Sequence, residues 1–226
     1  MNILALGDVF GPAGVKVIKE KLPKIIKEKK IDFVIVNGEN AADSGKGITK
    51  KIFNEFLESG ADVITTGNHV FNHKDAEDIA SKNLKFLRPA NLPKGSIGNG
   101  EGIFKKNGKN FIVLNLMGNV FMKKSEDVFM EAKRFLEKFS LGKEADFIIV
   151  DMHAEVTSEK MAMGHLFDGN ATLVFGTHTH VPTSDTRIME KGTAYQTDLG
   201  MCGDYNSVIG MNKENSLKKF LRDSSA

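Results

Sequence analysis

Residues 33–40 read Phe-Val-Ile-Val-Asn-Gly-Glu-Asn, an apolar, β-branched run that ends in a glycine and two side chains able to bind a metal. The run is typical of a buried strand, and its end is typical of a polar loop. Similar runs at 3–7, 63–67, 147–150 and 173–176 are followed by further candidates, namely Asp8, Asn68, His69, His153, His178 and His180. In an α/β sheet, ligands collect outside the carboxyl ends of the strands, so these separate segments are predicted to converge on one crevice.

The chain has the length and composition of a soluble globular protein, and we predict a single domain over residues 1–226. A net charge of +2 argues for neither a membrane surface nor a stable nucleic-acid complex as partner. Cys202 is the only cysteine, and the N-terminal apolar run is too short for a signal peptide or a spanning helix. We therefore expect a cytoplasmic protein, and the oligomeric state stays open.

The order of the predicted elements favours an α/β fold with two packed sheets flanked by helices. Helical spacing near 15–26 and 49–59 alternates with strands, whereas 84–116 shows short apolar runs and the hairpin signal Asn107-Gly108. Helices are predicted again near 128–139 and 158–167, before a β-rich segment at 171–196. Strands that alternate with helices and later form meanders fit two sheets better than one doubly wound sheet. A short helix at 216–221 is expected to pack on the domain.

Each candidate residue also has a structural interpretation, because a polar residue can simply end a strand and two histidines can lie on a surface. His178 and His180 alternate, so on an extended segment they would point the same way, and Gly176 allows a sharp turn before them. Together with His153 and the acidic strand ends, this pattern favours a metal site over a purely structural role.

The candidates outnumber the three or four ligands that a single zinc ion needs. Two divalent ions about 3.5–4 Å apart, bridged by a carboxylate and a hydroxide, would use the surplus and suit in-line phosphoryl chemistry. Two such ions carry more positive charge than Asp8, Glu39 and a hydroxide neutralise, so the site would attract an anionic phosphate. The nitrogen and oxygen ligands are compatible with iron, manganese, zinc, nickel or cobalt.

Several motifs resemble those of the calcineurin-like metallophosphoesterases. They are Gly38-Glu39-Asn40, Gly67-Asn68-His69 and Gly176-Thr177-His178-Thr179-His180, in that order and with Asp8 upstream. The chain is closer still to the YmdB-like branch, which it resembles at 7–9, 37–42, 66–69, 88–91, 151–155, 157–160, 176–181 and 197–201. This resemblance implies a four-layer metallophosphoesterase sandwich, with two mixed sheets between helices, and hydrolysis of 2′,3′-cyclic nucleotides.

The resemblance also implies a role for each candidate. Asp8, Asn40 and His180 would bind one metal ion; Asn68, His153 and His178 would bind the other; and Glu39 would bridge the two, with His69 as the proton donor. We expect iron or manganese, with zinc, nickel or cobalt as alternatives. Phe10 stands where many superfamily members have a histidine ligand, which Asn40 is expected to replace. Val70 stands where many have an acidic residue that orients the proton donor.

The preferred hypothesis is a dinuclear metal phosphodiesterase that acts on small cyclic nucleotides by attack of a bridging hydroxide, with His69 protonating the leaving oxygen. A phosphomonoesterase or phosphoprotein phosphatase with the same site is the alternative. A regulatory protein that keeps the metals with little turnover is a third hypothesis. His69 weighs against the third, because a binding module would not need a proton donor there.

Overall fold

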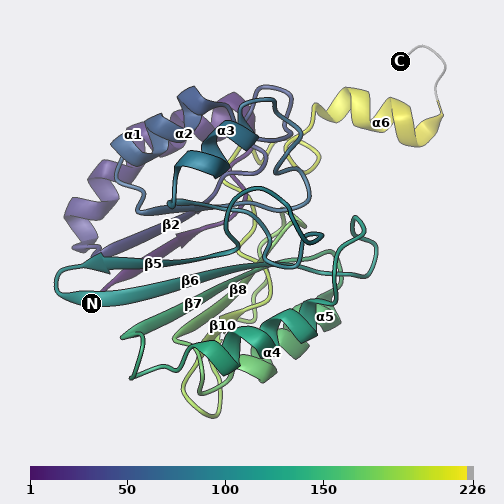
Figure 1. Ribbon diagram of the computed structural model, residues 1–226. Helices are drawn as coiled ribbons and strands as arrows, with labels where there is room; N and C mark the ends of the chain where they lie inside the picture. The colour runs from purple at the N-terminus through teal and green to yellow at the C-terminus, as the bar shows by residue number, and fades with distance from the viewer. Residues whose placement is uncertain (223–226) are drawn as a thin grey trace.

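The computed structural model describes residues 1–222 and contains two β-sheets packed face to face, with helices on both outer surfaces (Figure 1). The first sheet is parallel throughout and has the order β1-β2-β3-β4. Its strands are β1 (Ile3–Leu6), β2 (Phe33–Asn37), β3 (Val63–Thr65) and β4 (Phe86–Leu87). The second sheet has the order β5-β6-β7-β8-β10-β9 and is antiparallel only at its two edges. Its strands are β5 (Glu101–Lys106), β6 (Lys109–Met117), β7 (Phe147–His153), β8 (Leu173–Thr177), β9 (Arg187–Ile188) and β10 (Ala194–Gln196).

Helices cover the outer face of each sheet and complete four layers. Helices α1 (Gly11–Lys29), α2 (Lys50–Glu58) and α3 (Ala76–Lys82) bury apolar residues against the first sheet. Helices α4 (Val128–Lys138) and α5 (Thr157–Phe167) do the same on the second. Between the sheets lies a third apolar cluster, in which the rings of Phe33 and Phe111 stack with centroids 4.2 Å apart. The α/β sandwich expected from the sequence is therefore confirmed.

Local sequence signals explain several element boundaries. Thr49 is the N-cap of α2, and its hydroxyl oxygen accepts a hydrogen bond from the backbone N–H of Ile52 at 3.1 Å. Asn107 and Gly108 have φ angles of 51° and 72°, as a two-residue turn between β5 and β6 requires. Helices α4 and α5 serve as crossovers that make β6, β7 and β8 parallel, so the expected meanders are limited to the two edge pairs.

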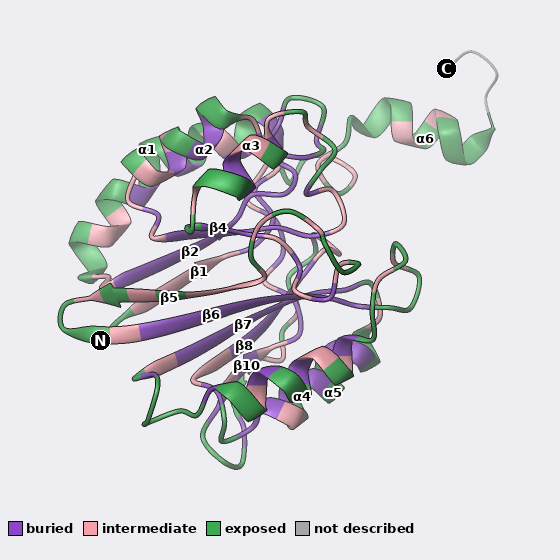
Figure 2. Cartoon of the chain, in the orientation of Figure 1, coloured by how far each residue is buried: buried purple, intermediate pink, exposed green. Residues whose placement is uncertain are grey.

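Helix α6 (Lys213–Leu221) corrects one prediction. Its apolar residues Leu217, Phe220 and Leu221, which were expected to pack on the domain, are 56%, 78% and 77% exposed. The helix projects away from the two sheets (Figure 2). An amphipathic pattern predicts a helix, but it does not say which surface the apolar face will meet. Within residues 1–222, no helix combines the length and the apolar content needed to cross a bilayer.

Candidate metal centre

The residues predicted to form the site all lie at the carboxyl ends of strands. The first sheet contributes Asp8 after β1, Glu39 and Asn40 after β2, and Asn68 and His69 after β3. The second sheet contributes His153 as the last residue of β7, and His178 and His180 after β8. Loops from both sheets thus supply the site, as the sequence predicted.

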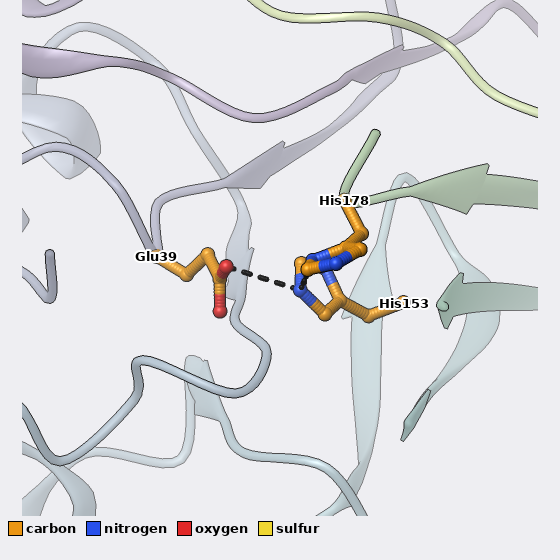
Figure 3. A group of neighbouring side chains, drawn as sticks. All are labelled: Glu39, His153 and His178. Carbon is orange, nitrogen blue, oxygen red and sulfur yellow. Dashed lines mark hydrogen bonds and ion pairs between the residues drawn. The ribbon is translucent and has the colours of Figure 1, made fainter. Parts of the chain in front are cut away.

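Four of these side chains meet around the Nε2 atom of His153. That nitrogen lies 3.0 Å from Glu39 Oε1, 3.0 Å from Asn68 Oδ1 and 3.1 Å from His178 Nδ1. Figure 3 shows Glu39, His153 and His178 facing one another, and their potential ligand atoms lie within 4.8 Å of each other. Two nitrogen and two oxygen donors around one point form a set that divalent transition metals accept.

Asp8, Asn40 and His180 lie beside this cluster and offer unused ligand atoms. Asp8 Oδ1 and Asn40 Oδ1 are buried and have no hydrogen-bond partner within residues 1–222. The ring of His180 donates from Nδ1 to the carbonyl oxygen of Ile209 at 2.8 Å, which leaves Nε2 free at 3.9 Å from Asp8 Oδ1. Buried oxygen atoms without a partner are costly, and a cation would remove that cost. The residues present therefore fit a metal ion.

A hydrogen-bonded chain behind the cluster fixes the ring of His153. The hydroxyl of Thr177 lies 2.9 Å from His153 Nδ1 and donates to Asp151 Oδ1 at 2.7 Å. Asp151 Oδ2 also accepts from Thr65 Oγ1 at 2.5 Å and from Asn37 Nδ2 at 3.0 Å. All of these side chains are buried. Because Nδ1 is occupied, Nε2 is the nitrogen that faces Glu39 and Asn68.

The electrostatics of the site favour a positive charge among its carboxylates. Burial raises the pKa of Asp8. Burial also opposes ionisation of Glu39, but the facing His153 lowers the pKa of that carboxyl group to about 2. Burial alone would lower the pKa of His153, yet Glu39, followed by Asp8 and Asp151, raises it to about 9. Burial and then the charge of His153 lower the pKa of His178 to about 3. A protonated His153 thus takes the place of a cation among the carboxylates.

His69 lies next to the cluster but does not share its contacts. Its backbone N–H donates to Glu39 Oε2 at 3.0 Å, while its ring atom Nδ1 is buried and has no hydrogen-bond partner among the described residues. Burial, supported by the charges of Lys123 and Lys46 and opposed by Glu39, lowers the pKa of His69. No described residue orients this ring through Nδ1.

A cavity of about 320 Å³ opens onto the site. Its lining includes Glu39, Asn40, His69, His178 and His180, together with the exposed Lys46. A larger cavity, of about 700 Å³, lies between α1 and α2 and contains none of the predicted site residues. The smaller cavity is therefore the candidate substrate site, because five of the predicted site residues border it.

Sequence reasoning missed three residues that support the predicted ligands, either directly or, in the case of Asp151, through Thr177. Thr177 and Asp151 support His153, and Glu155 Oε2 lies 3.1 Å from His178 Nε2. All three lie in motifs on which the family resemblance rests, but the spacing of these residues in the sequence did not indicate what they do. At the first departure from the superfamily, Phe10 packs edge-on against His180 with ring centroids 5.5 Å apart. At the second, Val70 is buried and offers no group to orient His69.

Comparisons with known proteins give a consistent family. The model of the family described as YmdB-like protein matches residues 4–226. The 2′,3′-cyclic-nucleotide 2′-phosphodiesterase of Bacillus subtilis (strain 168) is 46% identical over 220 residues, which cover 97% of this chain and 82% of that protein. A putative phosphatase/phosphodiesterase of Mycoplasma pneumoniae is 39% identical over 97% of this chain and 79% of its own length.

Solved structures agree with the same fold. A hypothetical protein from Thermus thermophilus superposes with a TM-score of 0.90 at 41% identity, over 98% of this chain and 84% of that one. A protein from Mycoplasma pneumoniae described as a novel phosphatase gives a TM-score of 0.89 at 40% identity, over 97% and 79% of the two chains. A putative 5′-nucleotidase from Staphylococcus aureus, at 17% identity, shares the fold with a TM-score of 0.66 over 90% of this chain and 49% of that one.

Proposed function

This chain belongs to the YmdB-like protein family, and from that premise we propose that it is a metal-dependent phosphodiesterase that hydrolyses small 2′,3′-cyclic nucleotides. The observation that carries the proposal is the convergence of oxygen and nitrogen donors from both sheets beside one cavity. The close relationship to a bacterial enzyme named for this activity supports the substrate class.

We assign the donors to two ions. Asp8 Oδ1, Asn40 Oδ1 and His180 Nε2 would hold one ion. The two oxygen atoms have no hydrogen-bond partner among the described residues. His180 Nε2 is available because Nδ1 of the same ring donates to the carbonyl oxygen of Ile209. Asn68 Oδ1, His153 Nε2 and His178 Nδ1 would hold the other, with Glu39 between the two groups. Nitrogen and oxygen donors without a thiolate suit iron or manganese, and also zinc, nickel or cobalt.

The bound ions would supply Lewis-acid stabilisation of the phosphoryl oxygens and an activated water. The protein's own residues would hold Glu39 in place and supply the proton. The backbone N–H of His69 holds Glu39 Oε2, which keeps Oε1 on His153. The ring of His69 borders the cavity and would give its proton to the leaving ribose oxygen. Its lowered pKa would rise again beside an anionic phosphate, which favours the protonated ring.

The size and charge of the cavity fit a small anion. A volume of about 320 Å³ is at the low end of the range for small-molecule sites, and Lys46 adds positive charge to its lining. With a net charge of +2, the protein lacks the strongly basic character expected for binding a nucleic-acid polymer. The single-domain organisation and the cytoplasmic location remain predictions.

The test compares three substrates with protein loaded with Mn²⁺. Initial rates on 2′,3′-cyclic AMP should exceed those on 3′-AMP and on an RNA oligomer without a cyclic end. His165→Ala, which changes an exposed histidine on α5, is the matched control for His69→Ala and should keep the wild-type rate. Faster hydrolysis of the monoester would favour a phosphatase instead. No turnover in protein that retains its ions would favour the regulatory metal-binding protein.

A further inference from the structure

The loop His178-Thr179-His180 has a backbone conformation that few residues other than glycine adopt. The φ angle is 98° at His178 and 66° at His180. Residues persist in such conformations where the surrounding structure over-determines them. The contacts that hold this loop therefore decide where the ring nitrogens of both histidines point.

Asp198 supplies contacts at the middle of the loop. Its Oδ2 atom accepts hydrogen bonds from the backbone N–H of Thr179 at 3.2 Å and from the Thr179 hydroxyl at 2.7 Å. Its Oδ1 atom accepts from the backbone N–H of Gly200 at 2.7 Å. Asp198 is completely buried. One carboxylate thus joins the residue between the two histidines to the segment that follows β10.

The same segment also reaches the first metal-binding loop. The backbone N–H of Met201 donates to the carbonyl oxygen of His180 at 3.1 Å, and that of Cys202 donates to the carbonyl oxygen of Asp8 at 2.8 Å. Residues 198–202 therefore connect the loop of Asp8 with the loop of His178 and His180.

Lys160 pairs with the same oxygen of Asp198 that accepts from Thr179. Its Nζ atom lies 2.6 Å from Asp198 Oδ2, and the residue is only 1% exposed although it belongs to α5. Its side chain passes Gly176, where an added Cβ would lie 2.8 Å from Lys160 Cδ. Replacing a buried ion pair by apolar residues is often neutral or stabilising. A contribution to folding stability alone therefore does not explain why this ion pair is present.

We propose that Lys160 and Asp198 are positioning residues, whose buried ion pair holds the 178–180 loop so that His178 Nδ1 and His180 Nε2 face the metal centre. The proposal rests on the proposed function in taking these nitrogens as metal ligands. Neither residue contacts the donor atoms, so the pair acts through Thr179.

The first test measures Mn²⁺ affinity by titration calorimetry. Lys160→Met should weaken binding by about 10–100-fold, as loss of a group that supports a metal ligand typically does. The matched control is Lys106→Met, because Lys106 pairs with Asp62 at 2.6 Å near the amino end of β3, away from the site. The control should bind Mn²⁺ as the wild type does. Wild-type affinity in a folded Lys160→Met protein would overturn the proposal.

A second variant guards against misfolding, because Lys160→Met leaves the charge of Asp198 buried without its partner. The double change Lys160→Met/Asp198→Asn removes both charges and keeps a side-chain oxygen for Thr179. We expect an unfolding temperature near that of the wild type but weaker Mn²⁺ binding. Wild-type binding in the double variant would contradict the positioning role.

Hydrogen exchange of the metal-free protein separates this proposal from the proposed function. In the double variant, amides of 176–181 should exchange faster while those of β6 keep the wild-type rate. Unchanged exchange at 176–181 would overturn the proposal. A wild type that binds Mn²⁺ but hydrolyses no phosphodiester would end the proposed function and leave the affinity comparison valid. If the wild type binds no Mn²⁺, the exchange rates still decide whether the pair holds the loop.

Discussion

The hydroxyl oxygen of Thr177 lies 2.9 Å from Nδ1 of His153. The hydroxyl proton is directed to Asp151 Oδ1, so the oxygen accepts from Nδ1–H and the imidazole must present Nε2 to the site. Thr177 is the last residue of β8 and His153 is the last residue of β7, and the register places the two side by side. Strand pairing thus fixes the tautomer of a proposed metal ligand.

Replacing Thr177 by valine tests this relationship. Valine has nearly the same shape but cannot accept from Nδ1, so the ring of His153 loses its orientation and Asp151 loses a donor. We expect Mn²⁺ affinity to fall by about 10–100-fold. Titration calorimetry should show near wild-type affinity for Thr177→Ser, which keeps the hydroxyl. Equal affinities of the valine and serine variants would show that the hydroxyl does not matter.

His69→Ala should slow hydrolysis without loss of ions. The ring of His69 borders the cavity but is not among the donors around His153 Nε2. Loss of general-acid help should reduce kcat by about 10²–10⁴-fold. Metal content measured by mass spectrometry should stay at the wild-type level, as it should in the control His165→Ala. If the ions are lost with the ring, His69 is a ligand and the assignment of roles must change.

Glu39→Gln should lower metal content and initial rate more than Asn40→Ala does. Glu39 contacts His153 through one oxygen and the backbone of His69 through the other, and it carries the charge that would lie between two cations. Glutamine keeps the shape but removes that charge, which raises the repulsion between the ions. Asn40→Ala removes one neutral donor from one proposed ion. Metal content and initial rates of both variants check the order, and equal values would count against a bridging role.

The sequence predicted the convergence of the site because each candidate follows a run of strand-forming residues. An apolar, strand-forming run precedes each of Asp8, Glu39 and His153. These polar residues therefore lie where a buried strand ends and a polar loop begins. The sequence could not predict the partners behind the ligands. Thr177 lies beside His153 only through the lateral register of β7 and β8, which no local pattern encodes, and Asp151 supports His153 through Thr177.

Helix α6 and the second sheet show a second limit to what the sequence predicts. The amphipathic spacing of Leu217 and Phe220 predicted a helix correctly, but the residues outside that helix determine what its apolar face meets. In the second sheet, the short strands suggested meanders, whereas the crossovers through α4 and α5 made the three neighbouring strands β6, β7 and β8 parallel. Strand direction depends on the path of the connection as well as on strand composition.

Metal binding should release a proton and should tighten as the pH rises. Burial favours the neutral ring of His153, but Glu39, Asp8 and Asp151 outweigh it and raise its pKa to about 9 in the metal-free protein. Below that pH the ring is protonated, and an ion can bind Nε2 only after the proton leaves. His178, whose pKa is lowered to about 3, is already neutral and should release none.

Calorimetric titration of the metal-free protein with Mn²⁺ at about pH 7.5 measures this proton. In buffers with different ionisation enthalpies, the observed heat should depend on the buffer with a slope of about one proton per His153. The pH dependence of folding stability is opposite in sign to the pH dependence of metal affinity. A histidine with a raised pKa stabilises the folded state below its unfolded pKa of about 6.5, and this contribution is lost as the pH rises through about 9. The metal-free protein should therefore lose unfolding free energy between these two values while its Mn²⁺ affinity increases. A binding heat independent of the buffer would show that His153 is neutral before the ion arrives.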